Sequence, residues 1–247
     1  MKSDSRILKQ VAVWNRRPSR ATAKALYHLV QKREGLSASG RGAVLIPLGE
    51  AAEMDWDFNL AQSHYLSVVA TANPLRDERL YARAAARCLL NTPRLRQVDL
   101  LHGVARLVQK LKPEQRTPRL AWLGAVAQGL LAVDARHWDR ARKAFEEAMG
   151  AAWESDDAEA EALAHHLLGQ TWLRLDKFAR ARQHITAARE AARRSGLWLV
   201  EKRLELEALL FDLTARLDAD VLAELRQLIS EIRKTGFPRF EFLAWFR

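Results

Sequence analysis

Apolar and small side chains recur along the chain at spacings of three and four residues, which gather side chains on one face of an α-helix. The two clearest stripes share an aromatic, a small, a large apolar and a small residue; they are Trp138, Ala141, Phe145 and Ala148, and, 40 residues later, Phe178, Ala181, Ile185 and Ala188. Less regular copies begin at Phe58, Leu95 and Leu222. The pattern predicts a series of amphipathic helices built on a repeated unit.

A glycine lies twelve residues before the first small position in three of these copies, at Gly49, Gly129 and Gly169. Two antiparallel helices approach most closely where their side chains are small. In the two clearest units we therefore expect Gly129 to face Ala141 and Gly169 to face Ala181 at the crossing point of a helical hairpin.

This unit resembles the tetratricopeptide repeat, a helix–turn–helix whose signature has a small residue in the first helix and Ala…Phe…Ala in the second. The best match runs from Ala162 to Ser195, and a second good match includes Gly129, Trp138 and Phe145. Key positions recur every 37 to 44 residues, further apart than the usual 34 of that family. Such long helices are similar to the helical-repeat sensor domains attached to some bacterial transcription regulators.

The resemblance implies an all-α fold, a right-handed solenoid of about five helix pairs over residues 42–235. A stretch rich in glycine and serine, residues 35–42, predicts a linker that follows a basic helical extension at residues 1–41. Residues 236–247 contain five aromatic side chains and predict a helix that caps the last repeat. The alternative for this segment is an exposed docking surface, through which the chain would form a homo-oligomer.

Composition agrees with a helical protein and narrows its class. The 247 residues include only 11 glycines and 7 prolines, and the single cysteine, Cys88, excludes an intramolecular disulfide framework. The most apolar stretch, residues 120–133, has 14 residues, whereas a membrane span needs about 20. We expect a cytoplasmic protein with no membrane segment.

The net charge of +10 is concentrated at the start of the chain. Residues 1–41 hold ten basic and two acidic side chains, whereas the other residues hold 30 basic and 28 acidic ones. The sequence therefore predicts a nearly neutral body that carries a basic arm. An acidic run at residues 156–161 is typical of a solvated first helical turn, and its alternative role is contact with that arm.

Motifs for catalysis are missing from the sequence. No glycine-rich phosphate loop and no His-Glu-x-x-His pattern occurs, and Cys88 falls within an amphipathic stretch that favours a core position. Neighbouring side chains on a helix diverge by about 100°, so His165 and His166 cannot chelate one ion together, and His184 does not complete a zinc spacing. We expect no enzyme activity, no cofactor and no metal.

The resemblance also implies a binding groove, because the first helices of successive tetratricopeptide units line a concave face. The positions that it assigns to a partner are Arg83, Arg87, Asn91, Val126, Leu130, His166, Gln170 and Arg174. Arg83 and Arg87 lie one helical turn apart and can grip a carboxylate or phosphate. The alternative is that they form ordinary ion pairs with Asp77 or Glu78.

The basic arm is a second candidate surface. Its cations surround a tryptophan, and the set is Lys9, Trp14, Arg16, Arg17, Arg20 and Lys24. Such a segment can neutralise nucleic-acid phosphates and stack on a base, or dock on an acidic protein. The leading hypothesis is a non-catalytic scaffold that binds a peptide or partner domain in the groove, and the alternative is a nucleic-acid-associated regulator.

Overall fold

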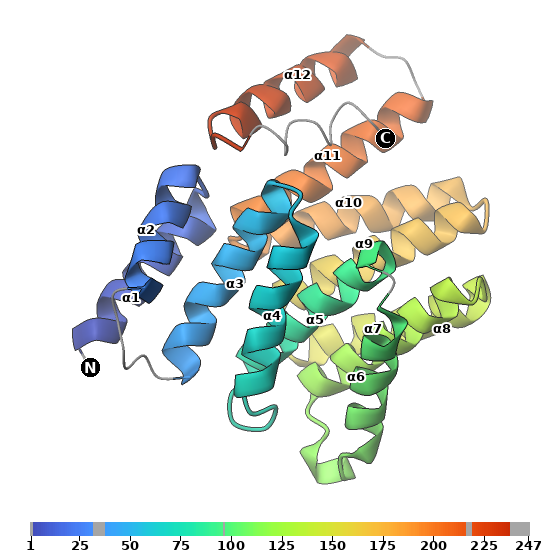
Figure 1. Cartoon of the computed structure of the whole chain (residues 1–247). Coiled ribbons are helices and arrows are strands. Elements are labelled where there is room, and N and C mark those ends of the chain that lie inside the picture. The colour runs from blue at the N-terminus through green and yellow to red at the C-terminus, as the bar shows by residue number, and fades with distance from the viewer. Residues whose placement is uncertain (1, 32–37, 96, 216–218, 238–247) are drawn as a thin grey trace.

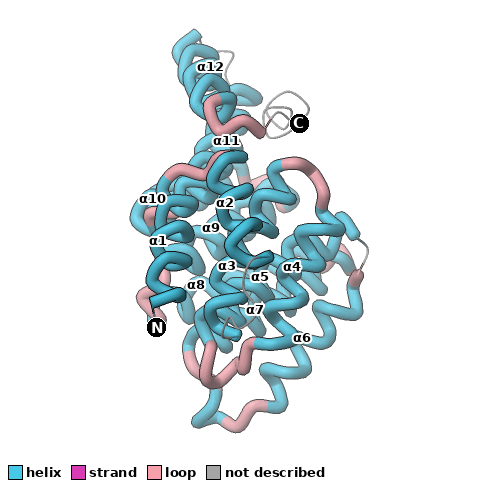
Figure 2. The backbone as a smooth tube through the Cα atoms, turned by 60° about the vertical axis from the view of Figure 1, so that its left-hand side comes forward, coloured by secondary structure: helices cyan, strands magenta, loops and turns pink. Residues whose placement is uncertain are grey.

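The computed structural model describes the chain except for residues 1, 32–37, 96, 216–218 and 238–247. The described part folds into α-helices, one 3₁₀ turn (Pro113–Gln115) and no strand (Figures 1 and 2). The helices are α1 (Lys2–Arg16), α2 (Arg20–Gln31), α3 (Ala38–Met54), α4 (Phe58–Thr71), α5 (Glu78–Leu95), α6 (Val98–Lys110), α7 (Pro118–Asp134), α8 (Trp138–Glu154), α9 (Ala158–Arg174), α10 (Phe178–Ser195), α11 (Trp198–Ala215) and α12 (Ala219–Arg233).

Successive helices pack in pairs, from α1 with α2 to α11 with α12. The predicted all-α helical repeat fold is therefore confirmed. The basic extension is itself one of the hairpins, and its two helices pack on α3. Because α3 begins at Ala38, the expected boundary between residues 41 and 42 falls inside a helix, and residues 38–42 of the expected linker are helical.

The glycines do mark close helix crossings, but a different side chain fills each one. A Cβ added to Gly129 would meet the ring of Phe145, and one added to Gly49 would meet the ring of Tyr65. At Gly169 the nearest group is Ile185, with the carbonyl of Ala181 next. The expected partner is thus corrected at Gly129, where the ring of Phe145 rather than Ala141 is nearest, whereas Gly169 does lie against Ala181, with Ile185 nearer still. The missing side chain of each glycine leaves space for a large residue of the second helix, one helical turn after the alanine.

Four helix–helix connections share one way of turning, three within hairpins and one, between α8 and α9, that joins two hairpins. Each has a non-glycine residue with a positive φ angle just after the helix that ends: Trp56, Arg136, Asp156 and Asp176. The next residue then donates its N–H back into the last turn, as His137 N does to the Ala132 carbonyl at 2.8 Å. This closure satisfies carbonyls that the ending helix leaves unpaired, and it starts the second helix at a fixed angle.

The first and last repeats meet, because α1 contacts α11. Near this junction Phe237 is buried, and its ring lies 6.3 Å from that of Trp14 in an edge-on arrangement. The predicted capping helix falls mostly on residues 238–247, outside the described residues. Within the described part, no helix is both long and apolar enough to span a bilayer.

Candidate functional site

A cavity of about 400 Å³ opens between the inner helices α5, α7, α9 and α11. Apolar side chains make up more than half of its lining: Ala82, Ala86, Leu90, Trp122, Leu130, Val133, Ala160, Leu163, Leu167, Leu199, Val200 and Leu204. The volume lies near the lower end of the range of ordinary ligand pockets, about 300–1,000 Å³. Each of these helices is the first of its hairpin. Together they form the face to which the resemblance assigned the binding of a partner.

Five of the eight predicted groove residues line this cavity together: Arg83, Arg87, Leu130, His166 and Gln170. The other three do not. Asn91 is buried and donates from Nδ2 to Glu53 Oε1 at 2.8 Å, so its amide joins α5 to α3. Val126 is fully buried in the core of α7, and Arg174 is exposed at the end of α9.

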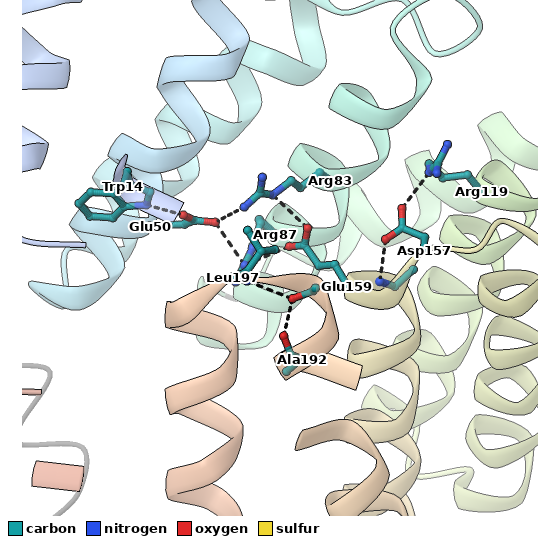
Figure 3. A network of polar contacts seen from close by, with 11 residues as sticks. Trp14, Glu50, Arg83, Arg87, Arg119, Asp157, Glu159, Ala192 and Leu197 are labelled. Atoms are coloured by element: carbon teal, nitrogen blue, oxygen red, sulfur yellow. Dashed lines mark hydrogen bonds and ion pairs between the residues drawn. The ribbon is translucent and has the colours of Figure 1, made fainter. Parts of the chain in front are cut away.

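Arg83 and Arg87 are held in a buried network (Figure 3). Arg83 Nη2 lies 3.0 Å and Arg87 Nη2 3.3 Å from Glu50 Oε1 on α3. On the other side, Arg83 Nε lies 3.2 Å from Glu159 Oε2 and Arg87 Nη2 3.3 Å from Glu159 Oε1. Trp14 Nε1 completes the network by donating to Glu50 Oε2 at 2.8 Å. Two cations and two carboxylates thereby compensate one another.

The surroundings keep Glu50, Arg83 and Arg87 charged. Burial by itself raises the pKa of the Glu50 carboxyl, but Arg83, Arg87 and the Trp14 hydrogen bond outweigh it and hold the pKa below its ordinary value. Burial by itself lowers the pKa of each arginine, yet the two carboxylates raise the pKa of Arg83 and of Arg87 above its ordinary value. Neither arginine therefore releases its proton in the folded chain.

These ion pairs correct two expectations from the sequence. The two arginines do pair with carboxylates, but with Glu50 and Glu159 rather than with Asp77 or Glu78. The acidic run that contains Glu159 was expected to be solvated or to contact the basic arm, whereas its carboxylate reaches α5. Sequence separations of up to 72 residues explain why local patterns did not reveal the network.

A second ion pair lies further along the groove. Arg119 Nε, at the start of α7, lies 3.0 Å from Asp157 Oδ2, and Arg119 Nη1 lies 3.8 Å from Glu78 Oε1. Asp157 also caps α9, since its Oδ1 accepts from Ala160 N at 3.2 Å. One carboxylate therefore stabilises the helix end and neutralises a groove cation.

A polar chain joins α11 to α9. His166 Nδ1 lies 2.9 Å from Glu207 Oε2, and His166 Nε2 lies 3.1 Å from Gln170 Nε2. Because a carboxylate only accepts, Nδ1 carries the proton, and in the neutral ring Nε2 is then an acceptor for one Gln170 N–H. The amide oxygen and the second N–H of the exposed Gln170 side chain have no partner among the described residues.

The lining supplied by α11 was missed in the sequence, although the weak fifth copy of the repeat begins a hairpin there. Leu199, Val200, Arg203 and Leu204 all line the cavity. Arg203 Nη1 lies 3.9 Å from Glu53 Oε2 on α3. The far wall of the groove is therefore tied back to the second hairpin, across most of the chain length.

The basic arm is largely as exposed as predicted, with one exception. Lys9, Arg16, Arg17 and Lys24 are exposed and form no ion pair within the described residues. Arg20 pairs with Asp55 at 2.6 Å, and its guanidinium lies 5.7 Å from the Phe237 ring centre. Trp14 is only 1% exposed, so the expectation that its ring stacks on a base is wrong. Trp14 packs in the core because it lies on the face of α1 that covers α3.

Two histidines that the sequence analysis excluded as a metal site lie close together. His165 Nδ1 and His184 Nδ1 lie 3.0 Å apart between α9 and α10. Among the described residues no cluster of three or more metal-ligating side chains was found. Cys88 is buried, and burial together with nearby Glu53 raises the pKa of its thiol to about 12.

No protein-family model matches this chain, and no curated protein matches its sequence. Among solved structures, one of similar fold is the crystal structure of a Rap protein complexed with competence and sporulation factor, with a TM-score of 0.61. The alignment has 13% identity and covers 95% of this chain and 65% of that chain, so this protein spans about two thirds of the Rap chain's length. This likeness places the fold among TPR-like helical repeat proteins.

Proposed function

We propose that this protein is a non-catalytic interaction scaffold that holds a peptide segment or a partner domain in the groove between α5, α7, α9 and α11. The observation that carries the proposal is the cavity of about 400 Å³ with an apolar floor on these helices. When a partner covers an open apolar surface and excludes water from it, the complex is stabilised by about 25 cal/mol for each Å² covered. The Rap protein of similar fold is itself complexed with a factor, which supports the same use of this architecture.

The proposal is tested by selecting displayed random peptides on the full chain and measuring their affinities for two groove variants. Leu163→Glu and Val133→Glu each place a charge in the apolar lining, and Leu66→Glu makes the same kind of change on the exposed part of α4. We expect both groove variants to weaken binding at least tenfold and the α4 variant to leave it unchanged. Equal binding by all three proteins would contradict the proposal.

A second candidate function rests on the unpaired cations of the α1–α2 hairpin, which suit nucleic-acid phosphates. Trp14 cannot stack on a base in this function, since its ring is buried. If Lys9, Arg16, Arg17 and Lys24 contact phosphates, the slope of log affinity against log salt is about −3.6 on duplex DNA, and replacing all four by Gln removes it. A salt-independent affinity would exclude this function.

A further inference from the structure

Resting on that proposed function, we infer that the groove selects an uncharged, apolar peptide segment and holds it by its main chain through Gln170. Three features of the groove point to this class of ligand: the paired charges of its walls, its apolar floor, and the Gln170 amide, which is held in place by His166 and Glu207.

Most charged side chains of the groove walls form ion pairs within the protein. Of the five arginines that line the cavity, four have a carboxylate within 4 Å: Arg83, Arg87, Arg119 and Arg203. Of the carboxylates that line it, Asp157 and Glu159 are paired with arginines, and Glu207 accepts a hydrogen bond from His166. A ligand carboxylate or ammonium would have to displace one of these internal partners, and a buried charge that loses its partner is strongly unfavourable.

Arg79 is the exception among the lining arginines. It is exposed in the first turn of α5 and forms no ion pair within the described residues. Its exposure leaves it hydrated and screened by salt, so it supplies little selectivity compared with the apolar floor. A preference of the groove for acidic ligands would therefore show as a dependence of binding on Arg79.

The apolar floor favours binding of aliphatic and aromatic side chains. Leu130 and Val133 on α7 face the cavity together with Leu163 and Leu167 on α9, and Leu199 continues the surface onto α11. On α7, every residue that lines the cavity after Arg119 is apolar: Trp122, Leu130 and Val133. Side chains of an extended segment would cover this surface and exclude its water.

Gln170 supplies the polar contact that an apolar segment still needs. A peptide backbone carries one N–H donor and one carbonyl acceptor per residue, and burying them unpaired is costly. The Gln170 amide offers one of each, because its other N–H is bonded to His166 Nε2. Glu207 fixes the His166 ring by accepting from Nδ1 at 2.9 Å, so Gln170 is oriented from two helices.

The test uses a random library of peptides about eight residues long, selected on the full chain at about 50 mM and about 500 mM NaCl. We expect the selected peptides to be rich in Leu, Ile, Val, Phe and Met and depleted of Asp, Glu, Lys and Arg. Their affinities should change less than about twofold between the two salt concentrations. Arg79→Gln should change them by less than about twofold as well.

The main-chain contact is tested by N-methylating each amide of the best peptide in turn. We expect one methylated amide to weaken binding at least fivefold in the natural chain and to have no added effect in Gln170→Leu. The matched control is Gln183→Leu, the same change at an exposed position of α10. If the methylation effect persists unchanged in Gln170→Leu, the assignment of Gln170 is refuted.

The outcomes separate the two proposals. If acidic peptides are enriched, and bind more weakly at high salt or to Arg79→Gln, the ligand class inferred here is overturned while the groove remains the binding surface. If selected peptides bind Leu163→Glu and Val133→Glu as well as the natural chain, the proposed function itself fails. Apolar peptides that lose affinity in these two variants and resist salt support both.

Discussion

Replacing Glu50 tests whether the network behind the groove stabilises the whole molecule. Glu50→Gln keeps the size of the side chain and an oxygen that can accept from Trp14, but it leaves Arg83 and Arg87 with Glu159 as the shared carboxylate. Breaking a buried ion pair by removing one partner costs about 3–5 kcal/mol. Because the tryptophan hydrogen bond survives, we expect the lower end, about 3 kcal/mol.

Glu50→Ala removes the acceptor too and leaves the buried N–H of Trp14 unpaired. An unsatisfied buried donor costs about 1–3 kcal/mol, so this variant should lose about 4–6 kcal/mol in all. The free energy of unfolding is measured by urea denaturation followed by circular dichroism. Asp55→Asn is the control: the Arg20–Asp55 pair is half exposed, and its loss should cost at most about 1 kcal/mol. A Glu50→Gln loss no larger than the control would refute the reasoning.

Three further predictions concern packing, pH and reactivity. Gly129→Ala should destabilise the chain by about 1–3 kcal/mol, since its Cβ would meet a buried ring, whereas Gly103→Ala, where a Cβ meets nothing, should stabilise it by about 0.5–1 kcal/mol; thermal melts compare the two. Burial lowers the pKa of His165 and of His184 below the ordinary 6.5, so the unfolded chain binds more protons in acid than the folded chain does. Their contribution to stability should therefore be complete above about pH 6.5 and fall below it. Replacing both by Asn should make the denaturation midpoint depend less on pH between about pH 7 and 5. Because Cys88 is buried, and burial also raises the pKa of its thiol to about 12, it should react with a thiol reagent only as fast as the chain unfolds; rapid reaction with the native protein would show that it is accessible.

The helices and their pairing were predictable because burial on one helical face leaves a period in the sequence. The aromatic and small positions from Trp138 and from Phe178 recur for that reason, and both residues begin second helices. The partner of each glycine was not predictable in the same way. The offset between two helices decides whether Gly129 faces the small residue or the ring one turn later, and the stripe is the same in both cases.

The groove was predictable in outline, since the register of the repeat identified five lining residues, but its electrostatics were not. Whether Arg87 meets Glu159 depends on how far the stacked hairpins curve, and neither helix records that curvature. The burial of Trp14 did leave a signal. Ile7 lies two helical turns before it, and both are about 1% exposed, so their spacing marks the face of α1 that packs inward.

Hydrogen–deuterium exchange of the full chain, with and without a selected peptide, tests most directly whether the groove is the binding surface. We predict that bound peptide slows amide exchange in α5, α7, α9 and α11, the four helices that line the cavity. Protection confined to the α1–α2 hairpin, or to the outer helices α4, α6, α8 and α10, would contradict a function that resides in the groove.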